Sequence, residues 1–100
     1  MGRMGAGLNI VARVIVAITA IIALIIAIGI LFHVLKANPD NAIVSLVDDV
    51  AGFFVGPFDE MFKLKDPKAE IAVNWGIALL VYVLVGRLLS KLIERASPEP

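Results

Sequence analysis

A stretch of 22 residues without a formal charge, Val14 to Leu35, constrains this chain more than any other feature. Arg13 and Lys36 bracket it. As an α-helix rising about 1.5 Å per residue it would extend roughly 33 Å, which matches a bilayer core about 30 Å thick. Its β-branched residues favour strand in water, but an isolated strand in lipid leaves its backbone polar groups unpaired. The stretch therefore predicts a transmembrane helix over residues 14–35.

A cleaved signal peptide is the principal alternative for this segment. The apolar region of such a peptide is ordinarily about 7–15 residues long and precedes a small-x-small cleavage site. Here the apolar run is longer, and Leu35-Lys36-Ala37 is a poor site. We therefore expect the segment to be retained.

A second apolar stretch, Ile71 to Gly86, has 16 residues without a formal charge and ends at Arg87. It would extend roughly 24 Å, and an arginine side chain can reach further to the headgroups. Leu88 and Leu89 prolong the apolar surface. We predict a second transmembrane helix over residues 71–89 that continues as an amphipathic extension and ends at Ser97-Pro98.

The composition favours lipid as the solvent of this chain. Hydrophobic residues make up 60% of its 100 residues before glycine is counted, against about 45–50% with glycine in ordinary globular proteins. A soluble domain of this size has too little interior to bury so much apolar surface. The formal charge is zero, which gives no field that would attract nucleic acid. The absence of cysteine excludes disulfides, thiolate metal sites and cysteine nucleophiles.

The segment between the predicted spans, residues 36–70, has the pattern of an amphipathic helix. Its polar positions fall on one helical stripe: Asn41, Ser45, Asp48, Asp49 and Gly52. The intervening positions form a wide apolar arc: Ile43, Val44, Leu46, Val47, Val50, Ala51, Phe53 and Phe54. Such a helix is expected either to lie in the membrane interface or to pack against a partner.

Proline and glycine predict where this helix is bounded. Asn38-Pro39 has the pattern of an N-cap followed by proline at the first helical position. Gly56-Pro57 predicts a break, after which Phe58, Met61 and Phe62 allow another short amphipathic turn. Pro67 is expected to stop any helix before the second span.

The distribution of lysine and arginine predicts the orientation. Two spans place both termini on one side, and five basic residues lie in the short ends against four in the longer loop. By the positive-inside rule, residues 1–13 and 90–100 are expected in the cytoplasm. Arg13, Arg87 and Trp75 are the expected interface anchors, with Trp75 on the outer face.

Two polar residues lie within the predicted spans near the loop. His33 and Asn74 have similar depths, so a helical hairpin would bring them within hydrogen-bond reach and fix its register. Alternatively, His33 is a proton-sensitive switch or a metal or haem ligand. A metal needs several converging donors and none accompanies this histidine, so a haem would require a second copy or a partner. We expect no metal and no cofactor.

Catalysis is not expected. The acidic pairs Asp48-Asp49 and Asp59-Glu60 are adjacent in sequence and predicted on a solvated face, not around a pocket. No Ser-His-Asp order, glycine-rich phosphate loop or metalloprotease motif occurs. Neither span carries a charge near its centre, which disfavours a transporter. An oligomeric pore remains open as an alternative, lined by Thr19, Asn74 or Ser90.

Small residues recur at helical spacing in both spans. The first carries Ala17, Ala20, Ala23 and Ala27, and in the second Ala72 and Gly76 form a small-xxx-small pair. Such residues let helix backbones approach closely. The sequence leaves open whether the partner is the other span or another chain.

Residues 30–90 resemble one half of the YggT family of small bacterial membrane proteins. The residues that carry the resemblance are Asn41-Ala42-Ile43-Val44-Ser45-Leu46-Val47-Asp48 and Gly56-Pro57-Phe58. Ala42 stands where the family usually has proline, and Asp59 and Glu60 stand where it has basic residues. The resemblance implies a role in the cell envelope, in division or in assembly of membrane complexes, and it implies no catalytic residue.

These observations predict an all-α membrane protein, a two-helix hairpin with an interfacial amphipathic helix in its loop. We expect a non-catalytic accessory or scaffold subunit of the inner (plasma) membrane that packs against a larger membrane complex or itself. The expected partner-binding residues are Ile43, Val44, Leu46, Val47, Val50, Phe53, Phe54, Ala20, Ala23 and Ala27. The alternatives are a holin-like oligomeric pore-former and a pH- or haem-responsive sensor subunit that uses His33.

Overall fold

The computed structural model of the chain describes residues 2–96, with side chains from residue 7 onward. Its elements in order are α1 (Gly2–Val34), α2 (Ala42–Val55), the short 3-10 helix η1 (Gly56–Phe58) and α3 (Pro67–Ala96). Residues 2–96 contain no strand. The prediction of an all-helical fold is therefore confirmed, whereas the helix end expected at Ser97-Pro98 lies outside the described residues.

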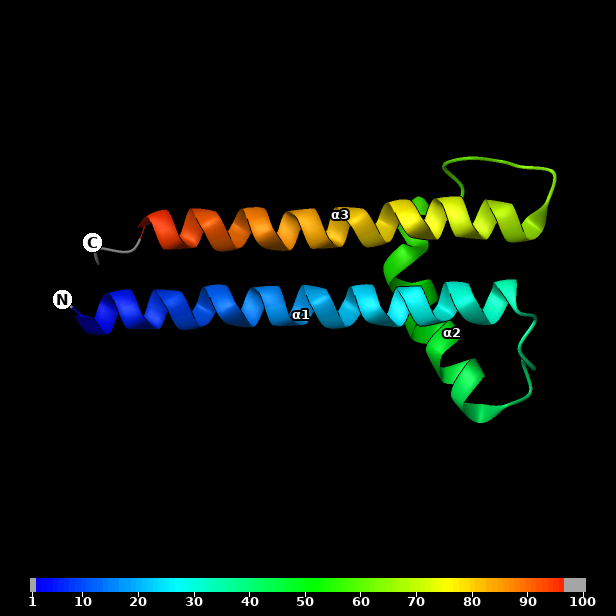
Figure 1. The fold of residues 1–100 in the computed structure, drawn as a ribbon, viewed down its shortest axis with the longest axis horizontal. Coiled ribbons are helices and arrows are strands. Elements are labelled where there is room, and N and C mark those ends of the chain that lie inside the picture. Colours follow the sequence, from blue (N-terminus) through cyan, green and yellow to red (C-terminus); the bar gives the residue numbers. More distant parts are fainter. Residues whose placement is uncertain (1, 97–100) are drawn as a thin grey trace.

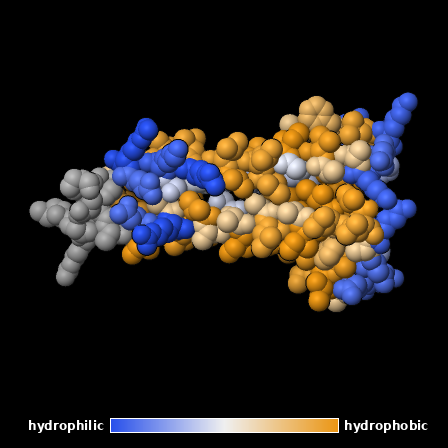
Figure 2. All heavy atoms as spheres, in the orientation of Figure 1, coloured by the Kyte–Doolittle hydropathy of each residue, from blue (hydrophilic) through white to orange (hydrophobic). Residues whose placement is uncertain are grey.

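Helices α1 and α3 lie side by side and run in opposite directions, so that the start of α1 lies near the end of α3 (Figure 1). Both helices are long and apolar enough to cross a membrane, over Gly7–Val34 and Pro67–Ala96. Both are longer than the apolar runs in them, because polar residues extend each helix beyond the run. Figure 2 shows a broad hydrophobic region between two hydrophilic ends.

Two glycines allow α1 and α3 to approach each other closely. A Cβ atom at Gly86 would overlap the side chain of Thr19, at 2.7 Å from its Cβ and 2.8 Å from its Cγ2. At Gly29 a Cβ atom would lie 2.9 Å from Cζ3 of Trp75. Gly76, which the sequence pairs with Ala72, has open space beside it. The expected small-xxx-small pair therefore does not form the close contact.

The alanine stripe of α1 is only partly used in this contact. Ala23 is buried, Ala27 is half-buried and Ala20 is exposed. The stripe drifts around the helix relative to α3, because a spacing of 3, 3 and 4 residues does not follow one straight line on a helix of 3.6 residues per turn.

The first turn of α2 begins three residues later than expected. The N-cap is Asn41, whose Oδ1 accepts hydrogen bonds from the backbone N–H groups of Ile43 and Val44 at 2.9 and 3.3 Å. Asn38 Oδ1 instead accepts from the backbone N–H of Asp40 at 3.0 Å. The prediction of an N-cap at Asn38 is wrong because this side chain closes a local turn of its own.

The other two helix ends also depend on local chemistry. Lys36 has a positive φ of 56°, and the N–H of Ala37 donates to the carbonyl of Phe32 at 2.8 Å, which ends α1 as a Schellman motif with lysine in the usual glycine position. Pro67 does not exclude helix but begins α3, and Asp66 Oδ1 accepts from the N–H of Lys68 at 3.1 Å. Proline is tolerated there because the first-turn N–H groups have no intrahelical partner.

The core lies where α2 crosses the other two helices, near the end of the molecule that carries the loops (Figure 1). It consists of five buried residues, contributed by all three α-helices: Ile26, Ala51, Val55, Trp75 and Ala78. Helix α2 is therefore packed onto α1 and α3 through its last turns and is not an independent tether.

Replacing Gly86 with alanine is expected to lower the free energy of unfolding by about 1–3 kcal/mol, because the new methyl group overlaps Thr19. Thr19 cannot turn away freely, since its Oγ1 donates to the carbonyls of Ile15 and Val16. Gly76→Ala is the matched control on the same helix; it should be neutral or stabilise by up to about 1 kcal/mol. Denaturant unfolding followed by fluorescence of Trp75, the single tryptophan, measures both. Equal stability of the two variants would contradict the close approach.

Candidate functional site

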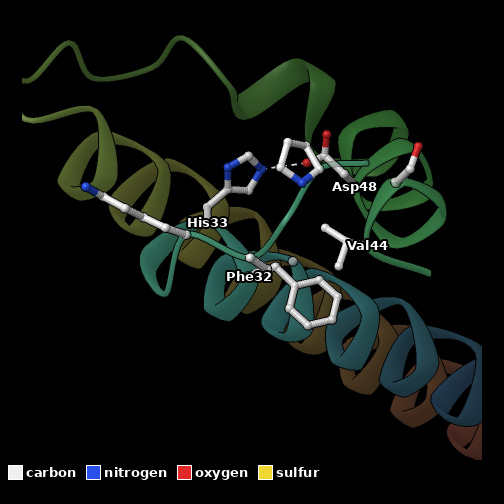
Figure 3. Close-up of a pocket in the computed structure, with 9 residues that line it drawn as sticks. Phe32, His33, Val44 and Asp48 are labelled. Atoms are coloured by element: carbon white, nitrogen blue, oxygen red, sulfur yellow. Dashed lines mark hydrogen bonds and ion pairs between the residues drawn. The ribbon is translucent and has the colours of Figure 1, made fainter. Parts of the chain in front are cut away.

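The end of α1 and the first half of α2 line a cavity of about 420 Å³ that is open on one side (Figure 3). Helix α1 contributes Phe32 and His33, and α2 contributes Val44, Ser45 and Asp48. The connection between the helices completes the wall with Lys36, Ala37 and Pro39. The cavity thus combines an aromatic ring with a small set of polar groups.

His33 and Asp48 join α1 to α2 across this cavity. His33 Nε2 lies 2.5 Å from Asp48 Oδ1, and because a carboxylate only accepts, Nε2 is the donor. The side chains are 35% and 48% exposed. The imidazole also packs edge-to-face on Trp75, with ring centroids 5.1 Å apart. The expected hydrogen bond between His33 and Asn74 is therefore wrong, since His33 bonds to α2.

Asn74 is fully buried and holds the chain that follows η1. Its Oδ1 accepts from the backbone N–H of Phe62 at 3.0 Å, while its Nδ2 donates to the carbonyls of Asp59 and Phe62, each at 2.9 Å. One amide therefore pairs three backbone groups that have no partner in a helix. This requirement decides the orientation of the side chain.

Two further hydrogen bonds from α3 hold the end of α2 and the residues after it. Trp75 Nε1 donates to Asp59 Oδ1 at 2.9 Å. The Tyr82 hydroxyl donates to the carbonyl of Phe54 at 2.7 Å, which satisfies one of the carbonyls left unpaired at the end of a helix. Sequence reasoning missed Tyr82, although a tyrosine within an apolar helix is itself a signal, because its hydroxyl needs a partner when buried.

The members of each acidic pair have different surroundings. Asp48 faces His33, whereas Asp49 is exposed. Asp59 accepts from Trp75, whereas Glu60 pairs with Lys63 Nζ at 2.9 Å. The hydrogen bond and charge of Lys63 lower the pKa of Glu60, and the same contact raises the pKa of Lys63. The expectation that both members of each pair lie on a solvated face holds for Asp49, Asp59 and Glu60, which are exposed, whereas Asp48 is half-buried.

The predicted partner-binding arc of α2 divides into two sides. Three residues point outward and are strongly exposed, namely Ile43 (68%), Leu46 (63%) and Phe53 (78%). Four are half-buried: Val44, Val47, Val50 and Phe54. The side against α1 and α3 is formed by Ala51 and Val55, which are fully buried. Only the outward side is available to another molecule.

The remaining candidates lie apart from this cavity. Arg13 and Arg87 are exposed on the half of the molecule that carries the termini. Ser90 is buried, and Thr19 is occupied by carbonyls of its own helix. Across the described part of the chain, no three His, Asp or Glu side chains are grouped so that they could hold a metal ion.

Compared with models of protein families, with curated proteins and with solved structures, the chain matches none. Its site is therefore interpreted from its own residues. These residues join α1, α2 and α3, and His33 and Asp48 pair between α1 and α2. The outward side of α2 is apolar.

Replacing Asn74 with leucine is expected to release the segment from Asp59 to Phe62, because three backbone groups lose their only side-chain partner. Leaving a buried backbone group unpaired costs about 1–3 kcal/mol. The amide of Phe62 should then exchange its hydrogen much faster, as measured by NMR. Val73→Leu, at the exposed neighbouring position, is the control and should leave that exchange rate unchanged. Continued protection of Phe62 in the Asn74 variant would contradict this role.

A double-mutant cycle of His33→Ala and Asp48→Ala is expected to give a coupling free energy of about 0.2–1 kcal/mol, because the pair is only half-buried. The same cycle with Asp49→Ala should give none, since that carboxylate is exposed. Unfolding curves of the purified variants supply the values. Coupling of His33 to Asp49 as strong as to Asp48 would refute the contact.

Proposed function

We propose that this chain is a bacterial inner-membrane protein whose α1 and α3 cross the bilayer as a hairpin, with both termini in the cytoplasm. Helix α2 then begins at the outer interface and slants toward the middle of the bilayer, because its last turns pack against Ile26, Trp75 and Ala78. In this proposal the protein is a non-catalytic accessory or scaffold subunit, and it is a relative of the YggT family. Asn41 and Gly56-Pro57 of the shared motif form the N-cap of α2 and the start of η1.

The placement in the membrane is supported by the relative depth of the charges. Trp75 contacts Gly29, and Gly86 contacts Thr19, so positions on the two helices correspond when their numbers sum to about 104. Lys91 therefore lies near the level of Arg13. From this level to Lys36 is roughly 34 Å at about 1.5 Å per residue, close to the thickness of a bilayer core with slight tilt.

The main support for the proposed function is the outward side of α2, formed by Ile43, Leu46 and Phe53. Together with the half-buried Val50 between them, we call these residues the docking face. These positions are spaced 3, 4 and 3 residues apart, so they form one stripe. The opposite side is fixed to α1 and α3 by buried contacts. A fixed apolar stripe binds a partner with little further loss of conformational entropy. The partner is a larger membrane complex or a second copy.

A second candidate function, a pH-responsive subunit, is favoured by the His33–Asp48 contact. Protonation of His33 would turn its hydrogen bond into an ion pair and change how tightly α2 is held. Other ionisable groups near the imidazole are Lys36 in the first cavity, and Asp59, Glu60, Lys63 and Glu70 in an adjoining cavity of about 430 Å³.

Site-specific photo-crosslinking in native membranes tests the docking face. A photoreactive residue at Leu46 or Phe53 should give a discrete protein adduct, because both side chains point away from the protein's own core. Its mass distinguishes a larger partner from a second copy. Leu80 and Leu84 on α3, which are 59% and 64% exposed, are matched controls that should face lipid and give no such adduct. Equal crosslinking at all four positions, or none at any, would defeat the proposal.

A further inference from the structure

A groove between α1 and α3, with no lining residue from α2, lies near the middle of the molecule and extends from there toward the termini. Its volume is about 420 Å³, and it extends along α1 from Val16 to Ala27 and along α3 from Leu79 to Arg87. Apart from Thr19 and Arg87, the residues that line it are apolar. The hydroxyl of Thr19 already donates to carbonyls of α1. The groove is therefore apolar and has one cationic residue, Arg87, at the end nearer the chain termini.

The length of the groove matches one leaflet of a bilayer. From Val16 to Ala27 the helix rises about 17 Å, and half of a hydrocarbon core is about 15 Å. Since the apolar run of α1 is bounded by Arg13 and Lys36, the groove lies mainly in the half of that run nearer the termini and ends just beyond its midpoint, at Ala27. This is the distance that one acyl chain of a phospholipid covers.

Arg87 supplies the charge at the end of the groove where a headgroup would lie. Its side chain is exposed, and none of the ion pairs found within residues 7–96 involves it. It lies one helical turn deeper than Lys91, and an arginine at that depth extends its guanidinium toward the headgroups. The planar guanidinium donates two parallel hydrogen bonds to phosphate.

We propose that this groove binds one anionic phospholipid, with an acyl chain between α1 and α3 and the headgroup phosphate on Arg87. The inference rests on the proposed insertion in the membrane. A partner helix in the same place would have to supply a carboxylate to Arg87 or leave the guanidinium desolvated without a counter-charge. A phospholipid supplies the acyl chain and the phosphate together, and in an anionic phospholipid no cationic group beside the phosphate repels Arg87. Lys91 does not line the groove and contributes only to the general field.

The experiment uses the full chain in vesicles of equal phosphatidylglycerol and phosphatidylcholine, followed by gentle detergent extraction and native mass spectrometry. The wild-type chain should retain one phosphatidylglycerol in preference to phosphatidylcholine. Arg87→Gln should reduce this preference about fivefold, the effect of one basic residue near anionic lipid. Lys91→Gln, the matched control, should leave it near the wild-type value. The double variant Ala20→Leu/Ala27→Leu should retain less of both lipids, because it fills the groove.

Equal losses in the Arg87 and Lys91 variants would overturn the site, since they would indicate diffuse attraction. Unchanged lipid retention in the Ala20→Leu/Ala27→Leu variant would also overturn it. Retention of a second copy of the chain, with no lipid bound, would do the same. Circular dichroism and Trp75 fluorescence establish that each variant is folded. Alkaline extraction separates the two proposals: release of the chain from the vesicles removes the membrane proposal itself. If the chain stays in the vesicles but shows no preference for phosphatidylglycerol, only the lipid-binding inference is removed.

Discussion

The buried amide of Asn74 is the interaction on which the loop end of this structure depends. The chain must return from η1 to the start of α3 beside an apolar helix, where unpaired backbone groups are costly. Asn74 pairs three of these groups. With Asp59 held in this way, its carboxylate lies where Trp75 can donate to it. Trp75 in turn packs against Gly29 and His33, so one side chain positions much of the core.

Helix α2 is consequently part of the folded body. Hydrogen bonds from His33 and Tyr82 reach Asp48 and the carbonyl of Phe54, and so hold its middle and its last turn. Packing of Ala51 and Val55 fills the space between these contacts. The exposed stripe on the opposite side is therefore presented in a fixed orientation. The partner-binding proposal relies on this fixed orientation.

The sequence predicts the two long apolar helices well, because length and charge-free runs are local properties. It fails where one local signal occurs twice: Asn38 and Asn41 are both good caps, and only Asn41 begins α2. It also places the start of the second long helix at Ile71, whereas α3 begins at Pro67. It also fails for His33 and Asn74. Their depths agree, but the returning loop occupies the Asn74 amide, and α2 supplies a carboxylate to His33. Contacts of this kind depend on how each helix is rotated about its axis and on residues that are far away in the sequence.

Helix α2 covers only one part of the contact between α1 and α3. At the loop end, α2 fills the space beside α1 and α3 and contributes the polar groups that pair with theirs. Among the described residues, α2 contributes nothing to the lining of the groove, which α1 and α3 leave along their line of contact. Within residues 7–96, Arg87 is the only charged residue that lines this groove. The proposed occupant matches this lining, since it is apolar along the groove and anionic beside Arg87. Both properties occur together in a phospholipid, whereas a helix would need a carboxylate at one defined depth.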